Sequence, residues 1–183
     1  VLEGKVFEPP YVLKPMNEGS SVGVRLVFEG DNISPLDEAN WAYGEYVLME
    51  RYIPGREIQV AVMDDKALGA IEIRPKKRFY DYEAKYSDGW ADHVLPADIP
   101  EADYQESLRL ALLAHQTLGC RGVTRADLRY DDTLNGAARF YMLEINTQPG
   151  MTLLSLVPEI AAFVGISFAE LMDFLVKDAG CQR

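Results

Sequence analysis

The chain has 183 residues, 48% of them hydrophobic, which is enough to bury a core in one ordinary domain or two small lobes. Its 29 acidic residues against 18 basic ones give a formal net charge of −11. This balance argues against nucleic acid as the main partner, because a binding face must neutralise phosphates with clustered Lys and Arg. It still permits a nucleotide where a few cations or metal ions converge.

The cysteines and the distribution of apolar residues bear on the cellular compartment. Cys120 and Cys181 are far apart in the sequence, so we expect reduced thiols rather than a disulfide framework or a close-paired metal motif. No apolar run reaches the roughly 18 residues of a membrane span, and the N-terminal residues have no signal-peptide pattern. We therefore expect a soluble, cytoplasmic protein without a membrane partner.

The N-terminal part of the chain predicts short strands around a polar loop. Tyr11–Lys14 is a short apolar strand, and residues 16–21 form a flexible loop that leads into a strand at residues 22–27. A short helix is expected around residues 35–43, and residues 46–50 return to a β-rich run.

The middle of the chain predicts a hairpin followed by a long loop. After a turn at Pro54-Gly55, the alternation of Ile58, Val60 and Val62 indicates a half-buried strand. Asp64-Asp65 forms a tight turn, and residues 67–73 form the returning strand. Residues 74–98 show no periodicity, which predicts a long loop of the kind that is often functional.

The C-terminal half predicts helices around two further strands. Residues 101–118 form a helix, with Pro100 in its first turn and Gly119 at its C-terminal cap. Residues 122–130 and 139–145 are strands joined by a turn. Near the end, Ser167 and Glu170 have the spacing of a capping box before an apolar helix face.

Two polar pairs on these last strands are the first candidates for chemistry. Residues two apart on a strand share a face, so Arg125 and Asp127 point together, as do Glu144 and Asn146. Adjacent antiparallel strands would gather all four, and their oxygen atoms suit magnesium while the guanidinium suits a reacting oxygen or a phosphate. The alternative is a solvated strand face with a surface ion pair.

Three other segments have both a functional and a structural interpretation. Lys14 and the Gly19-Ser20-Ser21 loop could cover a phosphate, although most such loops are only turns. Glu50 and the strand around it could meet an adenine edge, with Glu57 on the ribose, although such a strand is more often plain sheet. Residues 79–86 form an aromatic loop that could close over a site, or simply pack onto the surface. His93 and His115 are isolated and receive no role.

In order, these segments resemble the D-alanine–D-alanine ligases of the ATP-grasp superfamily. The two specific matches are the run Tyr-Asp-Tyr-Glu-Ala-Lys-Tyr at residues 80–86 and the run Asn-Thr-x-Pro-Gly-Met-Thr at residues 146–152. Supporting matches are Lys14-Pro15, Glu18-Gly19-Ser20-Ser21-Val22-Gly23, Leu118-Gly119-Cys120, Arg125-x-Asp127, Glu144-x-Asn146 and Ser155-Leu156-Val157-Pro158.

The resemblance implies an α+β ATP-grasp fold with residues 1–49 as the remnant of the small central lobe and residues 50–183 as the large C-terminal lobe. In this family ATP phosphorylates the carboxylate of one D-alanine, and the amine of a second attacks the acyl phosphate, for peptidoglycan synthesis. The implied cofactors are ATP and two Mg²⁺ ions, with Mn²⁺ as a substitute, and the full-length protein would be a homodimer.

The resemblance also implies a role for each matching residue. Metal ligands would be Asp127, Glu144 and Asn146, and nucleotide contacts would come from Lys14, Glu50, Ile53, Glu57 and Lys85. Arg125 would stabilise the oxyanion of the tetrahedral intermediate. Ser20 and Tyr86 would fix the closed loop, and Ser155 would bind the carboxylate of the second substrate.

Two departures and two rivals accompany this interpretation. Gln148 replaces the usual serine, with little expected effect, and only 13 residues precede Lys14, where the family has a further domain with a nucleotide-binding lysine. We therefore expect the isolated polypeptide to bind ATP weakly or not at all, and not to turn over. The rivals are another ATP-grasp carboxylate ligase, including a D-alanine–D-lactate ligase that Tyr86 disfavours, and a non-catalytic nucleotide-binding module.

Overall fold

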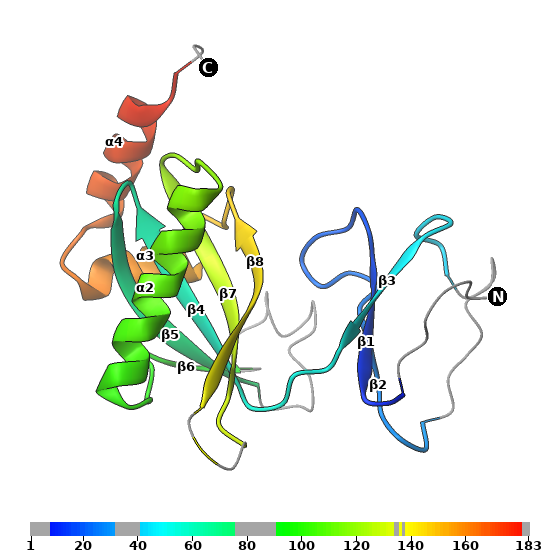
Figure 1. The fold of residues 1–183 in the computed structure, drawn as a ribbon. Helices are drawn as coiled ribbons and strands as arrows, with labels where there is room; N and C mark the ends of the chain where they lie inside the picture. The colour runs from blue at the N-terminus through cyan, green and yellow to red at the C-terminus, as the bar shows by residue number, and fades with distance from the viewer. Residues whose placement is uncertain (1–7, 32–40, 76–90, 134–135, 137, 181–183) are drawn as a thin grey trace. The chain divides into compact units, whose positions relative to one another are not determined.

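Two compact units make up the chain, and each has its own β-sheet. The structure is a computed structural model that describes residues 8–31, 41–75, 91–133, 136 and 138–180. One unit comprises Val1–Ile53 with Pro75–Ala91, and the other comprises Pro54–Arg74 with Asp92–Arg183 (Figure 1). The expected boundary after residue 49 falls inside the strand Val47–Arg51, so the division lies beyond the end of that strand.

The first unit contains a three-stranded antiparallel sheet in the order β2-β1-β3. Its strands are β1 (Tyr11–Pro15), β2 (Arg25–Val27) and β3 (Val47–Arg51). Alternate residues of β1 are buried, and Leu13 packs with Tyr11 and Val27 in a small core. The sheet confirms the expected strands, and this part of the chain therefore has its own apolar centre.

Two details of the first unit differ from the expectation. The strand predicted at residues 22–27 begins only at Arg25, because Gly23 and the two serines before it have positive φ angles that extended backbone does not allow. Of the helix expected around residues 35–43, the described residues 41–43 are not helical, and residues 35–40 lie outside the described residues.

The second unit contains a five-stranded sheet in the order β6-β5-β4-β7-β8. Its strands are β4 (Arg56–Met63), β5 (Lys66–Pro75), β6 (Ala91–Val94), β7 (Val123–Asp131) and β8 (Arg139–Asn146). The hairpin and the two later strands are confirmed. The loop expected at residues 74–98 is partly wrong, because β6 pairs along β5. A short edge strand with exposed Asp92 and His93 has no hydrophobic alternation that a sequence could reveal.

Helices cover both faces of this sheet (Figure 1). Helix α2 (Glu101–Thr117) packs on the face that carries Ile58, Val60 and Leu128. Helices α3 (Leu156–Phe163) and α4 (Phe168–Asp178) lie on the other side. Helix α3 was not predicted from the sequence, because it is apolar nearly all round and lacks the amphipathic pattern of a surface helix. Its residues Val157, Pro158, Ile160 and Ala161 are all buried.

The capping box of α4 supports a stability prediction. The Ser167 side chain accepts a hydrogen bond from the Glu170 amide at 3.3 Å, and the Glu170 carboxylate accepts one from the Ser167 amide at 2.8 Å. We expect Ser167→Ala to lower the free energy of unfolding by about 1 kcal/mol, because one helix N–H loses its acceptor. Urea unfolding measures this, and Ser167→Asp, which keeps an N-cap acceptor, should lose much less. Equal losses in the two variants would contradict the assignment.

His115 on α2 supports a prediction about pH. It is 3% exposed, and its Nδ1 lies 2.8 Å from the Thr124 hydroxyl of β7. Burial lowers the pKa of His115, against smaller opposing effects of Asp64 and a backbone hydrogen bond of Cys120. The unfolded chain therefore binds the proton more readily, and stability should fall as the pH drops below the unfolded value of about 6.5. Unfolding of His115→Gln measured from pH 7.5 to pH 5 should show a smaller fall than the unsubstituted protein. If the stability of His115→Gln falls as much as that of the unsubstituted protein, the role of His115 in this pH dependence is contradicted.

Candidate functional site

Strands β7 and β8 carry a row of polar side chains on the sheet face opposite α2. The antiparallel register sets Asp127 against Glu144 and Arg125 against Asn146. The four residues that the sequence paired two by two therefore lie together, and this juxtaposition is confirmed. Directly opposed residues on neighbouring strands have Cβ atoms about 4.5–5.5 Å apart, close enough for the two carboxylates to share a ligand.

A β-bulge in β8 makes this arrangement possible. Arg129 pairs with Tyr141 and Leu128 with Met142, but Asp127 pairs with Glu144, so Leu143 has no partner residue. The extra residue reverses the alternation of side chains along β8. Glu144 and Asn146 consequently share the face of Asp127, whereas Ile145 packs against the core under α2.

Arg125 and Asp127 form a two-pronged ion pair. The Arg125 Nε and Nη2 donate to the two carboxylate oxygens of Asp127 at 2.7 and 2.8 Å, and the side chains are 15% and 9% exposed. Burial of the guanidinium lowers the pKa of Arg125, but Asp127, Glu144 and Glu57 together raise it above its ordinary value. The Arg125 guanidinium is therefore held in its charged form beside these carboxylates.

Strand β4 extends the row with Glu57 and Gln59. Glu57 lies opposite Arg129, Gln59 lies opposite Asp127, and the Gln59 Nε2 donates to the Glu57 carboxylate at 2.9 Å. Sequence reasoning missed Gln59. A signal was present, however, because the apolar alternation of β4 places residues 57, 59 and 61 together on the opposite face.

The donor set of this row fits magnesium. Among the described residues there is no group of three His, Cys, Asp or Glu side chains that could hold a metal ion. The row instead supplies two opposed carboxylates, Asp127 and Glu144, with the amide of Asn146, whose Oδ1 also accepts from the Gln148 amide at 3.0 Å. Two protein carboxylates suffice for magnesium, which takes its other ligands from phosphates and water.

The first unit carries the expected residues Lys14, Ser20, Glu50 and Ile53. The Lys14 Nζ lies 2.7 Å from the Glu50 carboxylate, so the two residues form an ion pair on neighbouring strands. Ser20 and Ser21 have φ angles of 56° and 61°, which cost free energy for residues other than glycine. Such strain gathers at ligand-binding loops, so the loop geometry agrees with a binding role.

The expected residues Ser155, Lys85 and Tyr86 remain. Ser155 is the N-cap of α3, and its hydroxyl accepts from the Thr152 amide at 3.0 Å. A Cβ atom at Gly150 would lie 2.9 Å from that hydroxyl, so any larger residue there would have to displace the Ser155 side chain. Lys85 and Tyr86 lie outside the described residues.

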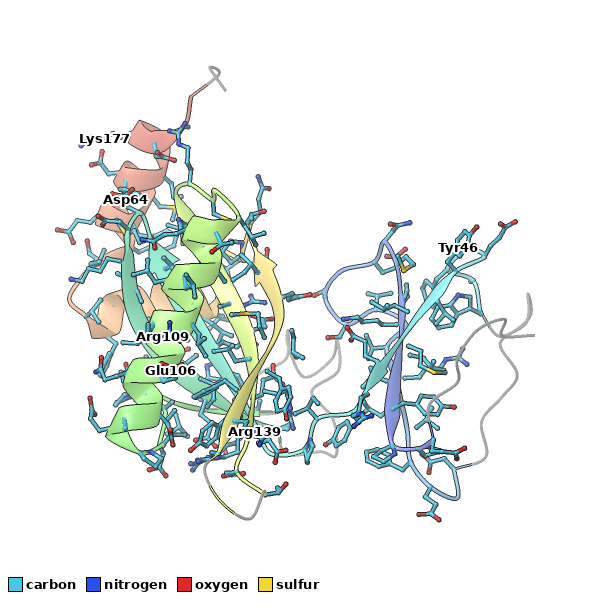
Figure 2. The ribbon with its side chains drawn as sticks, viewed as in Figure 1. Tyr46, Asp64, Glu106, Arg109, Arg139 and Lys177 are labelled. Carbon is cyan, nitrogen blue, oxygen red and sulfur yellow. The ribbon has the colours of Figure 1, made fainter. Side chains whose placement is uncertain are left out.

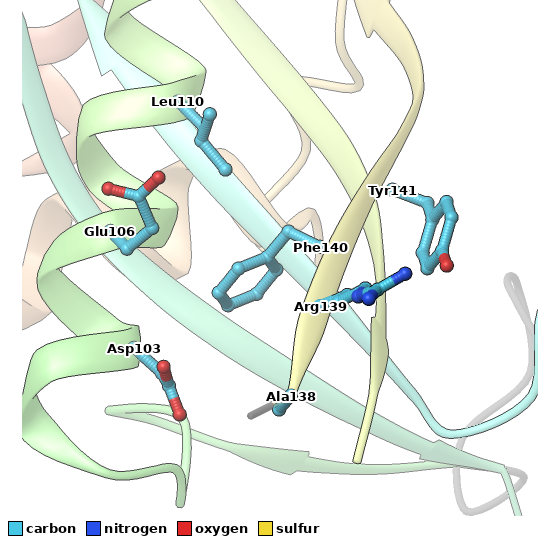
Figure 3. Close-up of a pocket in the computed structure, with 7 residues that line it drawn as sticks. All are labelled: Asp103, Glu106, Leu110, Ala138, Arg139, Phe140 and Tyr141. Atoms are coloured by element: carbon cyan, nitrogen blue, oxygen red, sulfur yellow. The ribbon is translucent and has the colours of Figure 1, made fainter. Parts of the chain in front are cut away.

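A groove of about 390 Å³ between α2 and β8 lies away from this row (Figure 3). Phe140 points into it from β8, and Glu106 faces it from α2. Glu106 is held by Arg109 one turn further along α2 through two hydrogen bonds of 2.7 Å (Figure 2). None of Arg125, Asp127, Glu144 and Asn146 lines the groove, so the groove contributes nothing to the candidate site.

Comparison with known proteins decides the family. Residues 3–177 match the family described as D-ala D-ala ligase C-terminus. The chain belongs to this family. Relatives of the family named D-alanine–D-alanine ligase include one from Chelativorans sp. strain BNC1, 56% identical over 96% of the chain, and one from Paramagnetospirillum magneticum, 58% identical over 94%. The chain spans 58% and 56% of the length of these two relatives.

Solved structures of the family agree with the fold. A D-alanine–D-alanine ligase from Bacillus anthracis complexed with ATP matches with a TM-score of 0.71 and 32% identity, over 92% of this chain and 53% of that one. The VanG D-Ala:D-Ser ligase from Enterococcus faecalis matches with a TM-score of 0.74 and 29% identity, over 92% and 49%. They confirm the expected α+β ATP-grasp fold. Within the described residues, no helix is long and apolar enough to cross a membrane.

Proposed function

We propose that this chain is the nucleotide- and metal-binding part of an ATP-dependent D-alanine–D-alanine ligase. The observation that supports the proposal is the acidic row, in which Asp127 faces Glu144 and Arg125 faces Asn146 across β7 and β8. The two units would be the small and large lobes of the ATP-grasp fold, acting in a cytoplasmic homodimer that makes peptidoglycan precursors.

The row has the charges that phosphoryl transfer needs. Asp127, Glu144 and Asn146 would hold two Mg²⁺ or Mn²⁺ ions, which when bound offset the charge of the ATP phosphates. Glu57 accepts from Gln59 and would bind a ribose hydroxyl. In the first unit, Lys14 would bind a phosphate and Glu50 the adenine amino group, so nucleotide binding would separate the ion pair that they now form.

The reacting groups of the substrates would be held by other residues. Arg125 keeps its charge at every physiological pH and would stabilise the oxyanion that forms when the second amine attacks the acyl phosphate. Ser155 would bind the carboxylate of the second D-alanine, Ile53 would contact adenine, and Ser20, Lys85 and Tyr86 would belong to the loops over the phosphates.

The similarity to a D-Ala:D-Ser ligase favours one second candidate, a ligase with another acceptor. The test is ADP release by the full-length protein, meaning the product of the complete reading frame that encodes this chain. With ATP, Mg²⁺ and D-alanine alone we expect turnover, whereas D-serine or D-lactate added as acceptor should compete poorly. No ADP release with D-alanine, together with release when D-serine is added, would overturn the preferred substrate.

A further inference from the structure

We propose that Gln59 is a positioning residue for Arg125, which it holds by a hydrogen bond when Asp127 turns to a metal ion. This inference rests on the proposed function, because it assigns Asp127 to the metal. Gln59 lies outside the segments that match the family motifs, and the contacts of its side chain support this role.

The Gln59 amide has one satisfied end and one unsatisfied end. Its Nε2 donates to the Glu57 carboxylate at 2.9 Å, and because an ionised carboxylate only accepts, this contact fixes which end faces Glu57. The Oε1 therefore points away from Glu57. It is buried in a residue that is 1% exposed, and no hydrogen-bond donor reaches it in the described part of the chain. Buried polar atoms are nearly always paired, so this oxygen calls for a donor that arrives in another state.

Arg125 is the donor that metal binding would release. Both oxygens of Asp127 now accept from its guanidinium. A divalent cation on Asp127 needs at least one of those oxygens, which leaves an N–H group of Arg125 without its partner in a side chain that is 15% exposed. A guanidinium has five N–H donors and no acceptor, so the lost contact must be replaced by another oxygen.

The register places Gln59 where it can supply that oxygen. Gln59 lies directly opposite Asp127, and Ala61 lies opposite Arg125. Diagonal neighbours on adjacent strands are within reach of long side chains, so the Arg125 guanidinium can reach toward Gln59. The other arginine of this row, Arg129, directs its Nη2 to the Gly55 carbonyl at 2.7 Å, toward the end of the sheet.

The consequence is that metal binding and the position of Arg125 are coupled through Gln59. Without metal, Arg125 is held by Asp127. With metal, the Gln59 Oε1 keeps the guanidinium in the row, beside the carboxylates that have taken up the cation. Gln59 would touch neither the nucleotide nor the metal.

The test is a double-mutant cycle on the full-length protein, with dissociation constants for the non-hydrolysable ATP analogue AMP-PNP measured by calorimetry in the presence and absence of Mg²⁺. In Mg²⁺ we expect Gln59→Met to weaken binding about tenfold, the size of one hydrogen bond to a charged group. In Arg125→Lys, which lacks the forked guanidinium, the further change Gln59→Met should add less than about twofold. Without Mg²⁺, Gln59→Met should change binding less than about twofold, because Asp127 still holds Arg125.

Two further variants separate this role from a purely structural one. Gln59→Asn keeps a neutral amide, with a donor for Glu57 and an acceptor oxygen, and should lose less affinity in Mg²⁺ than Gln59→Met. Gln105→Met is the matched control, because Gln105 also donates its Nε2 to a carboxylate, that of Glu101 at 2.8 Å, on the exposed side of α2. Additive losses in the cycle, or equal losses with and without Mg²⁺, would overturn the role of Gln59. If the unsubstituted protein does not bind Mg²⁺ and AMP-PNP, the proposed function fails and this inference fails with it.

Discussion

Asp127→Asn should abolish Mg²⁺-dependent nucleotide binding by the full-length protein while leaving it folded. Loss of a residue that only supports a metal ligand costs about 10–100-fold in affinity, so replacement of a ligand itself should cost about 100-fold or more. Asparagine has the shape of aspartate but no charge, and Glu144 would then face the cation without a second carboxylate. Calorimetric titration with Mg²⁺ and AMP-PNP measures the loss.

The same substitution should destabilise the protein in the absence of metal. Arg125 would lose the charged partner of a pair that is 15% and 9% exposed, which we expect to cost about 1–3 kcal/mol of unfolding free energy. Asp131→Asn is the matched control, because Asp131 is also buried on β7 and accepts from the Thr133 amide at 3.0 Å at the far end of the strand. It should lower stability but leave the Mg²⁺ dependence intact. Equal effects of the two substitutions on Mg²⁺-dependent binding would sink the metal assignment.

Deletion of Met142 and Leu143 together should remove the metal site by a change of geometry alone. Without these two residues, the alternation along β8 runs unbroken from Tyr141, so Glu144 and Asn146 turn toward α2 and Ile145 turns to the site face. We expect Mg²⁺-dependent binding of AMP-PNP to fall by about 100-fold or more, as for loss of the ligands themselves. The unfolding free energy should fall by about 1–3 kcal/mol, because a carboxylate then faces the core.

Deletion of Leu143 alone provides the comparison. It removes the bulge, but the regular ladder that remains still pairs Met142 with Leu128 and Glu144 with Asp127, so both carboxylates stay on the site face. Because no metal ligand changes face, its Mg²⁺ dependence should stay within about threefold of the unsubstituted protein. A double deletion that still binds nucleotide with unchanged Mg²⁺ dependence would contradict the assignment of Glu144 to the site face.

Most of the second sheet was predictable from local pattern. The alternation of Ile58, Val60 and Val62 marked β4 because one face of that strand is buried under α2 and the other carries polar groups. The capping-box spacing marked the start of α4. Strand β6 and helix α3 were not predictable in this way. The first is a short polar edge strand paired with β5, and the second consists almost entirely of apolar residues, so it has no polar side.

The candidate site shows the same division. Residue types and their spacing within each strand were enough to select Arg125, Asp127, Glu144 and Asn146 and to find the family, because a period of two fixes which side chains share a face. The sequence could not show that a bulge at Leu143 brings the two strands into phase, since a bulge depends on which residues pair across the sheet. Nor could it show that Gln59 has a buried oxygen without a partner, because only the packed neighbours decide whether a polar atom is satisfied.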